Sequence, residues 1–208
     1  MKNIVYPFPA GREGVFLKQI RQAIIDSKLL IFPTETFYGL GGNALNKQVA
    51  NAVFQLKGRQ QHKPFPVLIA GLPMLLSLAT EITPLAQKLM ERCWPGPLTL
   101  IFAARPGLPA GVVSVEQKIA VRVSSHPLVQ QLFQKLEVPL IATSANLSAA
   151  PAVSSFTDLS SGLVNQIDLA INGGRCPGEQ PSTIIDVSEP LPRLIRAGTI
   201  PFSDSLYR

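Results

Sequence analysis

The stretch "LIFPTETFYGLGGNA", residues 30–44, joins a short apolar run to a proline, two threonines and three closely spaced glycines. The apolar residues Leu29–Phe32 predict a short buried strand. The glycines within Gly39–Gly42 predict a tight turn with positive φ, since glycine adopts that backbone conformation most readily. The stretch therefore predicts a buried strand that is followed by hydroxyl side chains and then by a flexible, glycine-rich segment.

The glycines also match, in form, the dinucleotide-binding fingerprint G-x-G-x-x-A at Gly39, Gly41 and Ala44. That fingerprint needs an acidic residue about twenty positions further on, to bind the ribose. Residues 59–63 are instead basic and polar, "RQQHK". The phosphate-binding motif G-x-x-x-x-G-K-[ST] does not occur either. Both kinds of nucleotide site are rejected, and the question of what the glycines hold in place stays open.

Composition restricts the class of protein. The 208 residues are 46% hydrophobic and carry a net charge of +6, which suits one domain over 1–208 with an anionic partner. No run of 18 apolar residues predicts a membrane span, and the first residues lack the apolar core of a signal peptide. We therefore expect a cytoplasmic protein. Cys93 and Cys176 predict two reduced thiols, and no metal site is expected with His62 or His126.

Helix and strand patterns alternate along the chain. They predict about eight strands and about five helices, which is typical of an α/β fold with a sizeable mixed sheet. Thr83 and Pro84 predict the start of a helix, since threonine caps helices well and proline fits the first turn. The expected helices include Val15–Ser27, Val49–Leu56, Pro84–Trp94 and His126–Leu136. The expected strands are Leu29–Phe32, Pro66–Ala70, Leu98–Phe102, Ile119–Val123, Pro139–Thr143, Ile167–Ile171, Ser182–Val187 and Leu194–Arg196.

A cluster of cations lies in "LKGRQQHKP", residues 56–64. Cations at the end of a helix complement its dipole, which is one explanation for them. However, Gly58 should terminate the helix, so Arg59 and Lys63 would project from a loop. Arginine binds phosphate with a fork of donors and lysine with a point charge. With Lys57, these residues suit a triphosphate clamp.

Small and hydroxyl residues follow a predicted strand in "IATSANLSAAPA", residues 141–152. Thr143, Ser144 and Asn146 supply donors and acceptors, and the small residues between them let a ligand approach the backbone. Ser144 or Asn146 could equally cap a helix. The two interpretations are compatible, because the free N–H groups at a helix start also bind anions.

Two further stretches place charges on predicted strands. Lys118 and Arg122 flank an apolar strand in "KIAVRVSSHP", residues 118–127. A buried arginine is costly unless it is paired, either with a ligand carboxylate or with a structural glutamate. "PSTIID", residues 181–186, and "RLIRAG", residues 193–198, add Ser182 and Arg196 near strand ends.

Together with "RCWPGPLTLIF", these stretches resemble the YrdC-like family, and within it the bacterial threonylcarbamoyl-adenylate synthases. The resemblance covers about residues 14–200 in six ordered motifs. It implies a twisted, mixed open α/β sheet with flanking helices and a concave basic face, in a short form without an extra C-terminal domain. It also implies ATP-dependent condensation of L-threonine with bicarbonate, release of pyrophosphate, and a product that serves threonylcarbamoyl-adenosine modification of tRNA. The implied partners are these substrates, Mg²⁺ carried with ATP, and tRNA or a tRNA-modification protein.

The resemblance also assigns roles by position. Lys57 and Arg59 would act in catalysis. The L-threonine site would comprise Thr36, Tyr38, Arg122, Thr143 and Ser182. The ATP site would comprise Arg59, Lys63, Lys118, Ser144, Asn146 and Arg196, with no metal held by the protein alone.

One departure from the family pattern keeps alternatives open. Leu68 stands where many relatives have a histidine, which puts one contact to the amino acid in doubt. A related carbamoyl-adenylate enzyme with another acceptor is therefore one alternative. An RNA-binding module without catalysis is another, although the scarcity of aromatic residues leaves few platforms for stacking bases.

Overall fold

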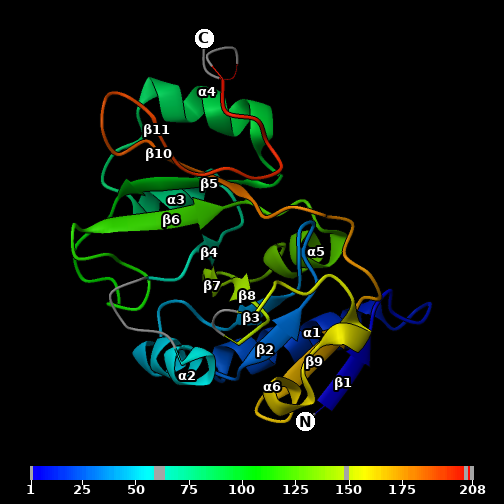
Figure 1. Ribbon diagram of the computed structural model, residues 1–208. Helices are drawn as coiled ribbons and strands as arrows, with labels where there is room; N and C mark the ends of the chain where they lie inside the picture. The colour runs from blue at the N-terminus through cyan, green and yellow to red at the C-terminus, as the bar shows by residue number, and fades with distance from the viewer. Residues whose placement is uncertain (1, 59–63, 148–149, 204–205, 207–208) are drawn as a thin grey trace.

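Two mixed β-sheets form the centre of the molecule in the computed structural model, which describes residues 2–58, 64–147, 150–203 and 206. Figure 1 shows one sheet above the other, with α4 at one end and β1 at the other. The five-stranded sheet has the order β1 (Lys2–Val5), β9 (Leu169–Asn172), β2 (Leu30–Phe32), β3 (Gly39–Gly41), β8 (Thr143–Ser144). The six-stranded sheet has the order β11 (Arg193–Arg196), β10 (Thr183–Asp186), β5 (Leu98–Ala103), β6 (Lys118–Arg122), β4 (Val67–Leu68), β7 (Leu140–Ile141).

The α/β class with a mixed sheet is confirmed, but one expected strand is divided between two sheets. Within the predicted strand Pro139–Thr143, β7 pairs with β4 in one sheet, whereas Thr143 begins β8, which pairs with β3 in the other. Between them, the backbone N–H of Ala142 donates to the carbonyl oxygen of Pro66 at 2.9 Å. This segment therefore joins the two sheets.

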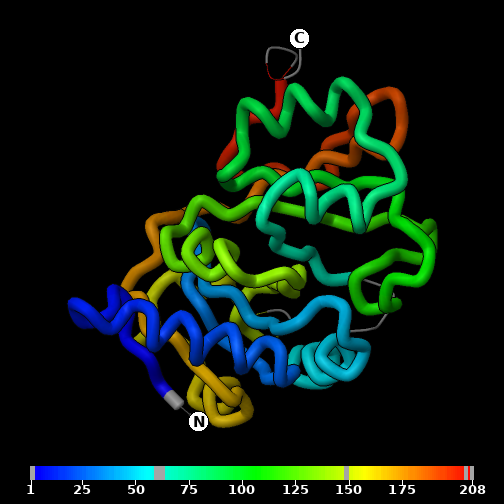
Figure 2. The backbone as a smooth tube through the Cα atoms, turned by 180° about the vertical axis from the view of Figure 1, so that it is seen from behind, coloured from blue at the N-terminus to red at the C-terminus, as the bar shows by residue number. Residues whose placement is uncertain are grey.

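Helices cover the outer faces of both sheets. Figure 2 shows α1 and α5 side by side, and these helices are in contact. No helix in the described parts of the chain is long and apolar enough to cross a membrane. The helices are α1 (Glu13–Ile25), α2 (Lys47–Lys57), α3 (Leu72–Leu78), α4 (Pro84–Cys93), α5 (Pro127–Phe133), a short 3-10 turn (Phe156–Asp158) and α6 (Ser161–Val164).

Two of the predicted helix ends, at Thr83 and Gly58, agree with the structure. The Thr83 hydroxyl accepts a hydrogen bond from the N–H of Ala86 at 3.1 Å, as an N-cap should. Gly58 follows α2 with φ 58° and ψ 30°, the left-handed conformation in which glycine ends helices. Both signals are local, because each depends only on residues within one helical turn.

The predicted turn at Gly39–Gly42 is wrong. Gly39–Gly41 form β3, and these glycines do not have positive φ. Gly41 is needed for a different reason: a Cβ atom there would lie 1.8 Å from the carbonyl oxygen of Ile141. The glycines therefore allow β3 to approach the segment that joins the two sheets. The sequence patterns also missed β1 and α3.

Two clusters of buried apolar side chains form the core. The larger one contains Ile31 and Leu40 from the five-stranded sheet together with Leu98 and Val121 from the six-stranded sheet. The other packs α1 and α5 against the five-stranded sheet through residues such as Ile24. Side chains alternate along a strand, and one face of β5, β6 and β10 is buried in the larger cluster. The other face of these strands, called the free face here, points away from that cluster.

His126 makes the stability of the fold depend on pH. Its Nδ1 atom accepts the N–H of Leu128 at 3.3 Å and so caps α5. Burial lowers the pKa of His126 from its ordinary 6.5, and the nearby charge of Glu35 opposes that shift. The unfolded chain therefore binds this proton more readily than the folded one. We expect the free energy of unfolding to fall as the pH drops below the ordinary pKa.

The substitution His126→Asn isolates this effect, since asparagine keeps a capping acceptor but does not titrate. Urea unfolding from about pH 7.5 to about pH 5.5 should show a shallower decline in the variant than in the wild type. Equal slopes for the two proteins would contradict the prediction.

Candidate active site between the two sheets

A cavity of about 590 Å³ lies between the two sheets. It is lined by the segment between β2 and β3, by the free faces of β6 and β10, and by residues of β8 and β11. It brings together eight of the residues that the sequence singled out: Thr36, Tyr38, Lys118, Arg122, Thr143, Ser144, Ser182 and Arg196. Lys57 and Asn146 lie behind its wall, and Arg59 and Lys63 fall outside the described residues.

Strand periodicity explains how the charged residues reach the cavity. On β6, Lys118, Ala120 and Arg122 line the cavity, whereas Ile119 and Val121 point into the core. The same alternation holds for β10 and the residue before it, where residues 182, 184 and 186 line the cavity. A period of two residues thus separates core and site on each strand.

The segment after Pro33 turns its hydroxyl groups inward. The Thr34 hydroxyl donates to the carbonyl oxygen of Phe37 at 2.7 Å and accepts the N–H of Thr36 at 3.2 Å. The hydroxyls of Thr34 and Thr36 lie 3.1 Å apart, and both residues are buried. A local hydrogen-bonded turn therefore fixes the Thr36 side chain at the cavity wall.

Arg122 is buried at the cavity and has a partner within the protein. Its Nη1 atom lies 3.3 Å from Oε1 of Glu35 and donates to the Thr36 hydroxyl at 3.2 Å. Burial lowers the pKa of Arg122, and the Glu35 charge partly restores it. Of the two pairings considered for this arginine, the structural glutamate is therefore present.

A second arginine faces the cavity from the edge strand β11. Arg196 donates through Nη2 to the carbonyl oxygen of Ser182 at 2.8 Å and to its hydroxyl at 2.9 Å. The same hydroxyl lies 2.9 Å from that of Thr99 on β5. Burial, and then the charge of Arg122, lower the pKa of Arg196. Two guanidinium groups thus give this part of the cavity an affinity for anions.

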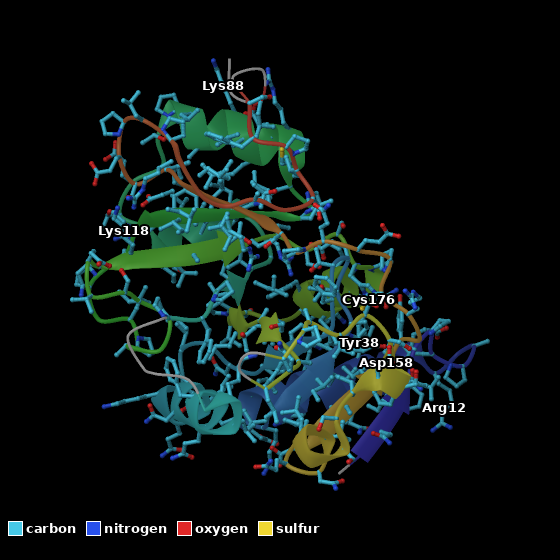
Figure 3. All side chains as sticks on the ribbon, in the orientation of Figure 1. Arg12, Tyr38, Lys88, Lys118, Asp158 and Cys176 are labelled. Atoms are coloured by element: carbon cyan, nitrogen blue, oxygen red, sulfur yellow. The ribbon has the colours of Figure 1, made fainter. Side chains whose placement is uncertain are left out.

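Lys118 belongs to an ion-pair network at another part of the wall. Figure 3 shows Lys118 at the start of β6, and its Nζ atom lies 3.0 Å from Oδ2 of Asp186 and 3.8 Å from Glu189. Arg193 approaches the same Asp186 oxygen at 3.5 Å. Although burial raises the pKa of Asp186, hydrogen bonds from Ser188 and Lys118 outweigh it and lower that pKa. Asp186 therefore stays ionised and holds Lys118.

Lys57 connects α2 to the segment after β8. Its Nζ atom donates to the carbonyl oxygens of Ser144 at 2.6 Å and Asn146 at 2.9 Å. It also donates to Oδ1 of Asn146 at 2.9 Å, and the Ser144 hydroxyl donates to that same oxygen at 2.6 Å. The ammonium group thus shapes the Ser144–Asn146 backbone, with Ser144 at the cavity wall.

Tyr38 is among the residues that line the cavity, but it is fully buried, and its hydroxyl binds a loop. The hydroxyl donates to the carbonyl oxygen of Gly174 at 2.9 Å and accepts the N–H of Gly173 at 3.0 Å. Burial raises its pKa to about 12, so the phenol stays protonated. Cys176, which follows this loop, acts electrostatically on Tyr38, and both residues are labelled in Figure 3.

Sequence reasoning missed several residues of the site. It left Glu35 without a role and gave none to Thr34, Thr99 or Asp186. The alternation of residues along β5 and β10 could have indicated Thr99 and Asp186. The Glu35–Arg122 pair has no signal in the sequence, because 87 positions separate the two residues.

Comparison with known proteins identifies the family of the chain. The Sua5/yciO/yrdC family model, whose description is "Telomere recombination", matches residues 22–198. The chain belongs to this family. A "Threonylcarbamoyl-AMP synthase" of Pyrococcus abyssi is 36% identical over 181 residues, which are 87% of this chain and 53% of that protein. A "Putative threonylcarbamoyl-AMP synthase" of Methanocaldococcus jannaschii is 30% identical over 95% of this chain and 92% of that protein.

Among solved structures of the Sua5/yciO/yrdC family, P. abyssi Sua5 complexed with L-threonine superimposes with a TM-score of 0.84. The two sequences are 34% identical, and the superposition covers 95% of this chain and 57% of the P. abyssi chain. The chain thus spans about half the length of its Pyrococcus relative.

Proposed function

We propose that this chain catalyses ATP-dependent synthesis of L-threonylcarbamoyl-adenylate from L-threonine and bicarbonate, with release of pyrophosphate. The observation that carries the proposal is the convergence of eight sequence-predicted residues on one cavity. The names of its relatives in the Sua5/yciO/yrdC family support the same reaction. The product would serve tRNA modification in the cytoplasm, with tRNA or a modification protein as the next partner.

The amino acid would lie near Arg122, with Thr36, Tyr38, Thr143 and Ser182 around it. The donors of the Arg122 guanidinium that bind no described residue would bind the threonine carboxylate, which a fork of N–H groups matches well. The buried hydroxyls of Thr36 and Ser182 would bind polar groups of the substrate. The complex of P. abyssi Sua5 with L-threonine supports an amino acid site in this fold.

The nucleotide would lie toward Ser144, Lys118 and Arg196. Lys57 would act indirectly, by holding the Ser144–Asn146 backbone, while Arg59 and Lys63 would contact the phosphates. The described residues contain no group of three acidic, histidine or cysteine side chains that could hold a metal ion. The Asn146 oxygen already accepts two hydrogen bonds. Mg²⁺ would therefore be held mainly by the phosphates, whose negative charge it would offset.

The reaction needs alignment rather than covalent catalysis by the protein. A carbamate oxygen attacks the α-phosphate of ATP, the bond to the β-phosphate breaks, and pyrophosphate leaves. Arg122 would fix the amino acid, and Arg196 and Lys118 would stabilise negative charge that develops on the phosphates. Hydrogen bonds to Ser182 hold Arg196 before the substrate binds, so little reorganisation is required.

Leu68 lies where the amino acid side chain would meet the wall. It is buried, lines the cavity and pairs with Arg122 in the β4–β6 register. An apolar group here would favour the methyl group of threonine over a polar side chain. Many relatives have a histidine at this position. We propose that Leu68 contacts the amino acid in its place and that the substrate is still L-threonine.

Pyrophosphate release from ATP tests the proposed function directly. With bicarbonate present, we expect release to require L-threonine, with L-serine at least about tenfold slower, since one methyl group is worth roughly that factor. Mass spectrometry should detect the adenylate. Arg122→Gln should abolish the threonine-dependent release of pyrophosphate, whereas Arg12→Gln, an exposed control, should leave it unchanged.

Two results would contradict the proposal. Turnover that does not depend on threonine would indicate another acceptor. Salt-sensitive binding of RNA without any turnover of ATP would favour an RNA-binding module.

A further inference from the structure

Glu35 lies next to the cavity without lining it. Its side chain is 9% exposed, and its two oxygens point to different partners. Oε1 lies 3.3 Å from Nη1 of Arg122, and Oε2 accepts a hydrogen bond from the Ser124 hydroxyl. The carboxylate therefore supports the guanidinium from the side away from the cavity.

The charge balance of the cavity explains why a carboxylate is needed there. Arg122 and Arg196 both line the cavity, and the charge of Arg122 acts unfavourably on Arg196. A buried guanidinium is stable only when it is paired. Among the described residues, Glu35 is the carboxylate that forms an ion pair with Arg122. Without it, Arg122 would be a buried cation without an ion-pair partner among the described residues, and its charge would act on Arg196.

The geometry leaves part of Arg122 available to a ligand. Within the described chain, its ion pair and its hydrogen bond to Thr36 both use Nη1. An arginine has five N–H donors, so those on Nε and Nη2 remain for an anion in the cavity. The Oε1 atom of Glu35 is shielded from solvent and accepts no hydrogen bond from the described residues, so its charge acts on the guanidinium.

We propose that Glu35, held by Ser124, is a positioning residue that fixes the Arg122 guanidinium for binding the carboxylate of the amino acid substrate. The proposal rests on the proposed function, because it assigns that carboxylate to Arg122. Glu35 does not touch the substrate. It sets the orientation of the side chain that does.

The first experiment needs no substrate. The ¹⁵N spectrum of the arginine side chains should show separate Nη signals for Arg122 in the wild type, because the held guanidinium rotates slowly. These signals, assigned by their loss in Arg122→Lys, should merge in Glu35→Gln. Glu137→Gln, an exposed control, should leave them unchanged. Separate signals in Glu35→Gln would overturn the proposal.

The second experiment measures binding of L-threonine and ATP by calorimetry. Glu35→Gln should weaken L-threonine binding by about tenfold or more and leave ATP binding within about twofold, since only the buried pair is broken. Unchanged or tighter binding of L-threonine would show that Glu35 does not position Arg122. If the wild type binds no L-threonine, the proposed function fails, and the spectrum alone decides the role of Glu35.

Ser124→Ala provides a milder variant in case Glu35→Gln does not fold. It keeps the buried ion pair but removes the hydrogen bond that holds Oε2. We expect weaker L-threonine binding by about twofold to fivefold and partial merging of the Arg122 signals. If both measurements match the wild type, the proposal is wrong.

Discussion

Lys57→Met is expected to lower the rate of pyrophosphate release by about 100-fold or more, which corresponds to roughly 2.7 kcal/mol or more of transition-state stabilisation. The ammonium group is buried and makes three hydrogen bonds to Ser144 and Asn146. Methionine fills similar space but leaves two backbone carbonyls and an amide oxygen without that donor. The segment after β8 should then lose the geometry that the phosphates require. Turnover at saturating ATP measures this effect.

The same substitution should also lower stability. Removing a charged donor from buried acceptors costs about 2–4 kcal/mol, which urea unfolding would detect. Lys47→Met is the matched control, because Lys47 lies exposed at the start of the same helix. It should change both quantities little. If Lys57→Met retained most of the activity, the segment would not depend on this lysine.

Gly41→Ala is expected to destabilise the fold by about 3 kcal/mol or more, because it overpacks a contact between backbones. The new Cβ atom would lie 1.8 Å from the carbonyl oxygen and 2.5 Å from the carbonyl carbon of Ile141. Neither atom is the end of a flexible side chain, so β3 and the segment joining the sheets must separate. The free energy of unfolding in urea measures the effect.

Gly14→Ala is the control for this substitution. Gly14 lies in α1, and a Cβ atom there would have nothing within 4 Å. Alanine should stabilise that helix by about 0.5–1 kcal/mol relative to glycine. A loss of less than about 1 kcal/mol in Gly41→Ala would mean that the backbone can shift to accommodate the methyl group.

The close approach at Gly41 also shows where sequence-based prediction reached its limit. The glycines were recognised as significant, but they were assigned to a turn, since a sequence shows only that a side chain is missing. Whether glycine serves a positive φ or a close contact depends on the neighbouring chain. That neighbour is Ile141, 100 positions away.

The α/β class and the caps at Thr83 and Gly58 followed from the sequence, because they depend on local hydrogen bonds and on the periodicity of apolar residues. Six residues that line the cavity were candidates from sequence motifs, whereas Thr36 and Tyr38 came only from the resemblance to the family. The tertiary structure alone decided that the strands form two sheets, and that Arg122 pairs with Glu35 and Lys118 with Asp186. Such pairings bring together residues far apart in the chain. Their energy depends on burial and distance, which the order of residues does not specify.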